Sequence, residues 1–145
     1  MNMTSARWAN REKTEIIVGI EGIGTLIKAQ PGLAIYDDIV AQGIDVAAYQ
    51  PTPADVRAEA QRRIIALTGA TDFNGCIVKQ LNASMRATEL TNKRAMGGEW
   101  TPEEAAEAVA LQALAAAIKA IRNRSNVMEP SPPDDFAQDE RWQDR

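Results

Sequence analysis

The chain has 145 residues, of which 45% are hydrophobic and only 5% aromatic, and it contains no histidine. This length fits one domain of ordinary size, or a small module joined to a helical one, and it excludes a large enzyme. The missing histidine removes the commonest general base, the commonest metal ligand and any Ser-His or Cys-His nucleophile pair. The formal charge of -4 resides in residues 125–145, which hold six acidic side chains against two arginines. The rest of the chain is neutral, so we expect no nucleic-acid binding.

Alanine is abundant, which predicts a thin core made by closely packed helices. Such helices bury little area per side chain, so association with a partner or with further copies of the chain would help to stabilise them. Cys76 is the only cysteine, which excludes an internal disulfide and predicts a buried thiol, with an intermolecular bridge as the alternative. No apolar run approaches the ~18 residues that span a bilayer, and no secretory signal is recognisable, so we expect a cytoplasmic chain without membrane contact.

Residues 1–50 predict a small α+β module. Two short β-branched runs at 15–20 and 25–28 flank a glycine-rich turn and predict a hairpin. A single buried helix is disfavoured because each glycine inside it would cost about 1 kcal/mol. The glycines lack the spacing and the following Lys-Ser/Thr of a phosphate loop. After the hairpin, apolar residues recur at helical spacing from Leu33 until Gly43, which predicts a short helix. An extended segment then leads into a Pro-rich linker.

Residues 51–128 predict three helices, at about 53–68, 72–95 and 102–124. The clearest start lies at Thr101, with proline at the first helical position and Glu104 placed to complete a capping box. An apolar seam follows at intervals of 3, 4 and 3 residues, formed by Leu111, Leu114, Ile118 and Ile121. An antiparallel helical hairpin closed by residues 97–100 is favoured over a long oligomeric stalk, because two heptads are too few for an independent coiled coil.

The helix at 72–95 carries its large apolar side chains on one stripe, at Ile77, Leu81 and Met85. We expect this stripe to form its seam. The C-terminal half of the helix is more polar, with Thr88 and Thr91 near the seam. These hydroxyls either face water or bond to a partner.

The tail, residues 129–145, is rich in proline and acids, with Phe136 and Trp142 as its only large apolar anchors. Such a segment cannot fold alone. It is either a solvated end or a strand that docks into a groove through its two aromatic side chains.

No pattern in the sequence indicates catalysis. Carboxylates occur in adjacent pairs, and neighbours on a helix point about 100° apart, so they cannot share a substrate. They are better explained as surface charges or as acids that complement a helix dipole. We therefore expect no enzyme, no catalytic residue, no cofactor and no metal site, and a fold that is α+β and mainly α.

Three stretches carry a resemblance to a known family: RWANREKTEIIV, PGLAIYDDIVAQGIDVAAYQP and TPADVRAEAQRRI. They resemble the tail-fibre assembly chaperones and related tail accessory proteins of tailed bacteriophages and prophages. The shared features are an aromatic-x-Asn entry before a strand, a Tyr-containing helix that ends at Gly, and an aromatic that leads into a Pro-rich linker. Here these positions are Trp8, Asn10, Tyr36, Gly43, Tyr49 and Pro51. The resemblance extends over most of the chain through two further features. One is a helical hairpin that follows the linker, and the other is a Pro- and acid-rich tail that ends in tryptophan.

The resemblance implies a protein that binds unassembled tail-fibre or other tail proteins in the bacterial host cytoplasm. The aromatic-rich final helix of the family is replaced here by LQALAAAIKAIR, which makes a structural component of the virion tail the main alternative; a regulatory phage protein is a third. We expect the contact surface to combine the exposed aromatics with whichever side of the apolar seam stays uncovered. These residues are Trp8, Trp100, Phe136, Trp142, Leu111, Leu114, Ile118 and Ile121.

Overall fold

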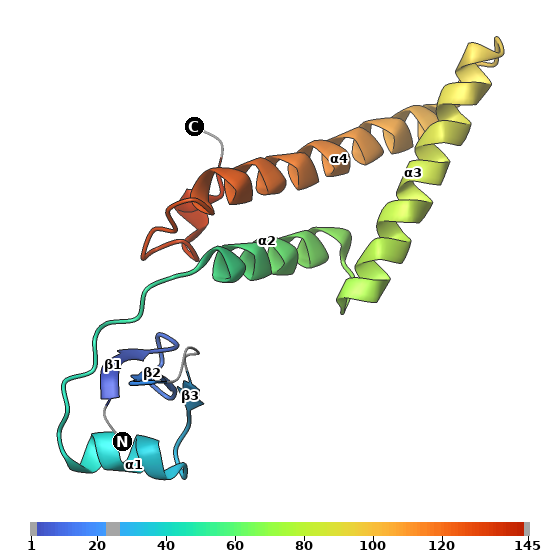
Figure 1. Cartoon of the computed structure of the whole chain (residues 1–145). Coiled ribbons are helices and arrows are strands. Elements are labelled where there is room, and N and C mark those ends of the chain that lie inside the picture. Colours follow the sequence, from blue (N-terminus) through green and yellow to red (C-terminus); the bar gives the residue numbers. More distant parts are fainter. Residues whose placement is uncertain (1–2, 23–26, 144–145) are drawn as a thin grey trace. The chain divides into compact units, whose positions relative to one another are not determined.

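The computed structural model describes residues 3–22 and 27–143. It is α+β and mainly helical, which confirms the predicted fold class (Figure 1). The chain divides into two compact units, residues 1–50 and residues 51–145. The acidic tail, which the sequence sets apart as a third segment, belongs to the second unit.

The first unit is a three-stranded antiparallel sheet with one helix. Strands β1 (Met3–Trp8), β2 (Ile16–Ile20) and β3 (Ile27–Ala29) lie in the order β1-β2-β3, and α1 spans Ala34–Ala41. The predicted hairpin is confirmed by the pairing of β2 with β3, while residues 23–26 lie outside the described part of the chain. The sequence did not predict β1, because MTSARW has neither a β-branched run nor a clear apolar alternation.

The core of this unit forms around the central strand. Ile16, Val18 and Ile20 of β2 are buried together with Ala29 and Ile39. Trp8 packs against this cluster and is only partly exposed. Its backbone N–H donates to the carbonyl of Ala47 at 3.0 Å, which joins the segment after α1 to the sheet edge. The expectation of Trp8 as a freely exposed contact residue is therefore wrong.

The second unit contains α2 (Pro53–Thr68), α3 (Phe73–Ala95), α4 (Pro102–Met128) and a short 3-10 helix, η1 (Asp139–Arg141). Capping boxes start α2 at Thr52 and α4 at Thr101, where the hydroxyl accepts from the N–H of Glu104 at 3.1 Å. Gly69, with φ of 67°, ends α2 in the left-handed conformation that favours glycine. Helix α4 runs one turn beyond the predicted end because its buried seam continues through Ser125 to Met128.

Helix α4 packs against both other helices. It runs antiparallel to α2 along its C-terminal half, where Arg57 pairs with Glu129 at 2.8 Å. The predicted antiparallel hairpin is α3 and α4: Lys93 contacts Glu104 near the turn, and Gln80 contacts Arg122 at the far end. In Figure 1, α2 follows α4 closely while α3 departs from it at a steep angle. The hairpin is therefore splayed.

The tail folds back onto α2 and α4. Phe136 and Trp142 are 9% and 6% exposed and share a core cluster with Val56, Ala60 and Ile121. The indole N–H of Trp142 donates to the carbonyl of Phe136 at 2.7 Å. Of the two predicted alternatives for the tail, docking into a groove through the two aromatic side chains is confirmed, and the groove belongs to the same chain. The expectation that Phe136 and Trp142 are exposed is wrong, because α2 and α4 leave an apolar groove that these two rings fill.

Candidate functional site

An apolar hollow lies between α3 and α4. This groove has a volume of about 510 Å³, and its floor is formed by Leu111, Leu114 and Ile118 of α4 facing Ala83 and Ala87 of α3. Ile118 is buried, and the two leucines are partly exposed. One side of the predicted seam is thus left uncovered, and we call this hollow the α3–α4 groove.

Small side chains explain why the groove exists. Alanines on the facing side of α3 fill little of the space beside the leucines of α4. Ile121, the fourth residue of the predicted seam, does not enter the groove; it packs against α2 and the tail. The structure therefore brings together Leu111, Leu114 and Ile118. Trp100 lines a neighbouring hollow with Leu111, whereas Phe136 and Trp142 lie in the cluster that contains Ile121.

The rim of the α3–α4 groove is polar and positively charged. Lys119 and Arg122 lie at the rim, with the amides of Gln80, Asn123 and Asn126, and no carboxylate lines the groove. The guanidinium of Arg122 donates to the side-chain oxygen of Gln80 at 3.3 Å, which bridges the two helices. In a chain with net charge -4, this local excess of cations favours a ligand that combines apolar anchors with negative charge.

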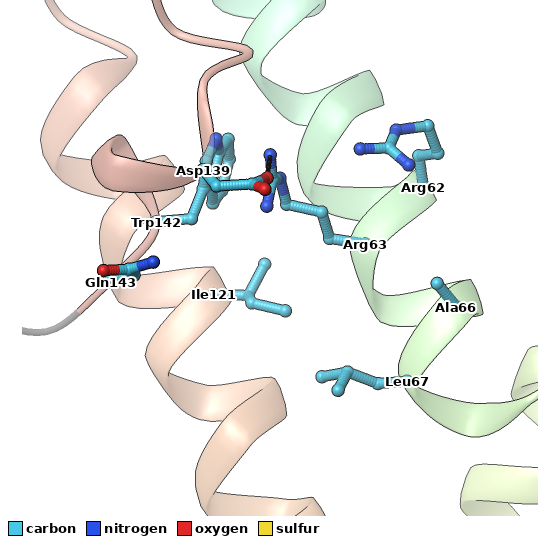
Figure 2. A pocket seen from close by; sticks show the side chains of 8 residues that line it. All are labelled: Arg62, Arg63, Ala66, Leu67, Ile121, Asp139, Trp142 and Gln143. Atoms are coloured by element: carbon cyan, nitrogen blue, oxygen red, sulfur yellow. Dashed lines mark hydrogen bonds and ion pairs between the residues drawn. The ribbon is translucent and has the colours of Figure 1, made fainter.

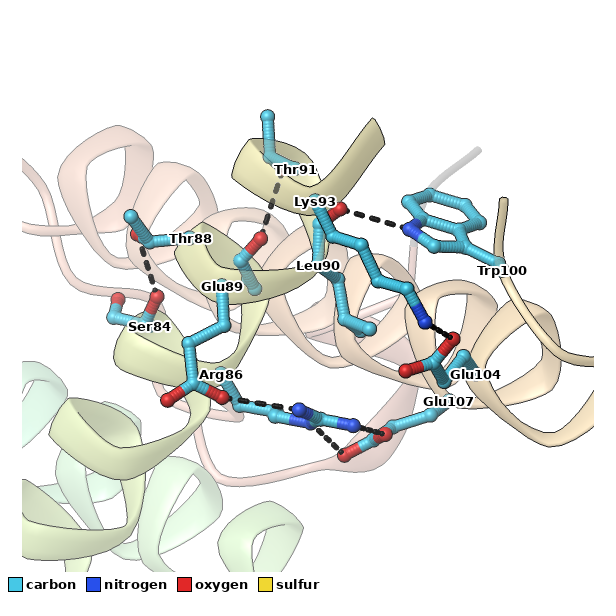
Figure 3. A network of polar contacts seen from close by, with 11 residues as sticks. Ser84, Arg86, Thr88, Glu89, Leu90, Thr91, Lys93, Trp100, Glu104 and Glu107 are labelled. Carbon is cyan, nitrogen blue, oxygen red and sulfur yellow. Dashed lines mark hydrogen bonds and ion pairs between the residues drawn. The ribbon is translucent and has the colours of Figure 1, made fainter. Parts of the chain in front are cut away.

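A network of ion pairs joins α3 to α4 near the helical turn (Figure 3). Arg86 donates to both carboxylate oxygens of Glu107, at 3.0 and 2.9 Å, and also to Glu89 at 3.0 Å. The hydrogen bond from Arg86 holds the pKa of Glu107 below its ordinary value, and the same contact raises the pKa of Arg86. Both groups are charged at neutral pH, so they hold the two helices together and do not exchange protons.

Trp100 lies at the hairpin turn, where it lines a smaller hollow with Leu90 and Leu111. Its indole N–H donates to the carbonyl of Leu90 at 2.8 Å, and the guanidinium of Arg94 covers the ring at 4.7 Å from its centre. The ring is therefore only partly exposed. The sequence predicted Trp100 as an exposed contact; the structure places it in the hairpin turn, where its ring packs back onto the end of α3.

The outward side of α3 carries a second apolar surface, which we call the outer α3 face. It consists of Ile77, Val78, Leu81 and Met85, with Phe73 at its edge, each between 47% and 59% exposed; Phe73 also lines a hollow with Cys76 and Gln80. The expectation that Ile77, Leu81 and Met85 form the seam is therefore wrong. The residues turned towards the neighbouring helices recur instead at intervals of 4, 3, 4 and 3: Cys76, Gln80, Ala83, Ala87 and Leu90.

A signal for the true seam is present in the sequence. The 4-3 alternation of the inward residues matches the spacing of the α4 seam, whereas the i, i+4 row of large side chains does not. The large apolar side chains of Ile77, Leu81 and Met85 suggested wrongly that this stripe of the helix is buried. The inward positions of α3 carry small or polar groups because they face an alanine-rich partner, and this leaves the larger side chains outside.

Another hollow, lined by α2, α4 and the tail, has a volume of about 520 Å³ (Figure 2). Arg63 lies in its wall and pairs with Glu59 at 2.7 Å and Asp139 at 2.8 Å, while also donating to the carbonyl of Ala137 at 3.0 Å. Burial raises the pKa of Glu59, but the hydrogen bonds and charges of Arg62 and Arg63 outweigh it and lower the pKa overall. These paired charges attach the tail to α2.

Within the described ranges, no three His, Cys, Asp or Glu side chains are grouped so that they could hold a metal ion. None of the helices described is both long and apolar enough to cross a membrane. No protein-family model, curated protein or solved structure matches the chain. The chain's own surfaces are therefore the basis for inferring its function.

Proposed function

We propose that this protein is a bacteriophage tail or tail-fibre assembly factor that works by non-covalent binding of another tail protein. The observation that carries the proposal is the α3–α4 groove, whose floor of Leu111, Leu114 and Ile118 stays open between two helices. An apolar concave site with few polar groups at its rim is the usual form of a binding site. The phage assignment is supported by the resemblance of residues 7–64 to tail accessory proteins.

The groove chemistry indicates what the bound segment should look like. Apolar side chains would occupy the floor, and one or more carboxylates would meet Lys119 and Arg122 at the rim. A client in the course of assembly exposes such segments, because slowly folding β-rich fibres leave apolar surface and strand edges unpaired. Covering them would oppose aggregation until the fibre is complete.

A structural component of the virion tail is the second candidate. The outer α3 face favours it, because a permanent subunit buries exposed apolar surfaces of this kind against its neighbours. Both candidates act by binding, and they differ in whether the chain remains in the finished particle.

The binding step is tested with tagged chain isolated from producing cells, followed by quantitative mass spectrometry of the proteins retained. Leu114→Glu places a charge on the groove floor and should reduce recovery of a tail protein at least about 10-fold. Val127→Glu is the matched control, because Val127 lies on the same helix, is 72% exposed and does not line the groove. Circular dichroism melting of both variants verifies that they fold. Equal recovery with folded Leu114→Glu, or retention of proteins unrelated to tails, would overturn the proposal.

The number of copies of this chain in purified particles distinguishes an assembly chaperone from a structural tail component. Mass spectrometry of purified particles and of lysate gives the number of chains per major tail protein in each. Abundance in lysate with depletion from particles identifies an assembly chaperone. A fixed copy number in particles identifies a structural tail component.

A further inference from the structure

The outer α3 face is an apolar surface that nothing else in the described chain covers. Helix α3 has 23 residues but buries only Cys76 and Leu90 within its own chain. Five large apolar side chains of α3 are left roughly half exposed, four of them on the outward side and Phe73 at its edge. Scattered single hydrophobic residues are normal on a protein surface, whereas a contiguous patch marks an interaction site.

The outer α3 face carries no charge. Between Phe73 and Met85 the only ionisable groups are the thiol of Cys76, which is buried, and Lys79, whose ammonium group donates to the carbonyl of Gly69 at 2.9 Å. The remaining polar residues in this stretch are amides and one serine. An uncharged apolar face gains nothing from a charged partner and is matched best by a surface that is also uncharged and apolar.

The row of side chains has a geometry suited to self-association. Phe73, Ile77, Leu81 and Met85 follow one another at i, i+4 spacing and form a ridge of about 18 Å along the helix. Ridges of this kind on two helices interdigitate when the helices cross at about -50°. A two-fold axis near Leu81 would place the same ridge on both sides of the contact.

The area also fits a pair of identical chains. Five half-exposed large side chains leave roughly 500 Å² of apolar surface per chain, comparable with the largest patches of ordinary monomers. Two such faces would bury on the order of 1,000 Å², which lies at the lower limit for a specific interface and predicts a dissociable dimer.

We propose that the outer α3 face is a dimerisation surface and that its occupant is the same face of a second copy of this chain. The α3–α4 groove is lined by different residues of α3 and stays accessible in the dimer. Dimerisation is therefore independent of the proposed binding of a tail protein in the α3–α4 groove, and the two can be tested separately.

Sedimentation velocity of the whole chain across the micromolar concentration range tests the dimer. Wild type should shift from monomer to dimer with concentration. Leu81→Glu buries a charge at the contact and should raise the dissociation constant at least about 100-fold, while Val127→Glu should behave as wild type. Helix content and melting temperature of the variants exclude misfolding.

Cross-linking supplies a second readout that does not depend on a destabilising charge. In Leu81→Cys the new thiols of two copies lie near the two-fold axis, so a short bis-maleimide should couple them efficiently. Wild type, with its single thiol at the 2% exposed Cys76, and Val127→Cys should give little product. A wild-type chain that stays monomeric throughout, a folded Leu81→Glu that dimerises normally, or equal coupling through Val127→Cys would overturn the proposal.

Discussion

The guanidinium carbon of Arg63 lies 5.2 Å from the centre of the Trp142 ring, so a residue of α2 covers the last large apolar side chain of the tail. The same guanidinium bonds to Glu59 on its own helix and to Asp139 and the Ala137 carbonyl on the tail. An acidic, proline-rich segment thereby becomes part of the folded unit, because Asp139 is paired with Arg63 and the two aromatic rings of the segment are buried.

Replacement of Trp142 by alanine should lower the free energy of unfolding of the helical unit by about 3 kcal/mol, since a buried aromatic side chain is lost and a cavity remains. Urea unfolding followed by circular dichroism measures the change. Glu140→Ala, at an exposed position two residues away, serves as the control and should change stability by less than about 0.5 kcal/mol. Equal stability of the two variants would show that the tail does not contribute to the core.

Arg62 and Arg63 are neighbours with different expected effects. The side chain of Arg63 is only 15% exposed and holds the tail, whereas that of Arg62 is 64% exposed and pairs with Glu59 alone. Arg63→Ala should cost about 1–2 kcal/mol because the partly buried carbonyl of Ala137 loses its donor and the Trp142 ring loses the guanidinium that covers it. Arg62→Ala should cost at most about 0.5 kcal/mol, since an exposed ion pair contributes little. Trypsin cleavage after Arg141 should accelerate in Arg63→Ala only; similar rates in both variants would contradict the role of Arg63.

Acid should weaken the fold through Glu59. The folded-state pKa of Glu59 lies below the ordinary value of 4.5, because the contacts with Arg62 and Arg63 outweigh the raising effect of burial. The unfolded chain therefore binds a proton at higher pH than the folded chain does. The stabilisation is complete above pH 4.5 and is lost as the pH falls from 4.5 through the lower folded-state pKa.

Urea unfolding at a series of pH values measures this dependence. Glu59→Gln cannot titrate, so it should be less stable than wild type at pH 7 and should lose less of its remaining stability on acidification. Parallel pH curves for the two proteins would show that Glu59 does not contribute to the acid sensitivity.

Two threonines in the hairpin should respond in opposite directions to alanine. Thr101 caps α4, and its loss should cost about 1 kcal/mol because the N–H of Glu104 loses its acceptor. Thr91 lies inside α3, is exposed and bonds only to the Ala87 carbonyl one turn back. Thr91→Ala should be neutral or stabilising by up to about 0.5 kcal/mol, because alanine has the higher helix propensity. Thermal unfolding of both variants checks the difference in sign.

Local chemistry in the sequence was enough to place most elements. The helix starts at Pro53 and Pro102 follow from threonine caps with proline at the first helical position, and the pairing of β2 with β3 follows from a β-branched run beside turn glycines. These signals involve residues a few positions apart, so no tertiary information is needed to read them. Strand β1 was missed because it is held by pairing with β2 and with Ala47, neither of which leaves a pattern in MTSARW.

The candidate site was predicted only in part. The α4 seam was recognised from its 3-4-3 spacing, but spacing cannot tell which neighbour covers each residue. Tertiary packing placed Leu111, Leu114 and Ile118 along the groove and Ile121 under α2 and the tail. Trp8 and Trp100 likewise pack within the chain, since an aromatic ring near a turn is drawn to whichever apolar surface the fold leaves beside it.

The sequence by itself determined the α+β class, the helix starts and the presence of apolar stripes, because capping and periodicity are local properties. Only the tertiary structure decided which stripe of α3 is buried and whether the tail is folded. Both outcomes depend on the space between helices. Alanine-lined surfaces on α3 and α4 leave the large side chains of α3 outside, and the groove between α2 and α4 has the room that Phe136 and Trp142 occupy.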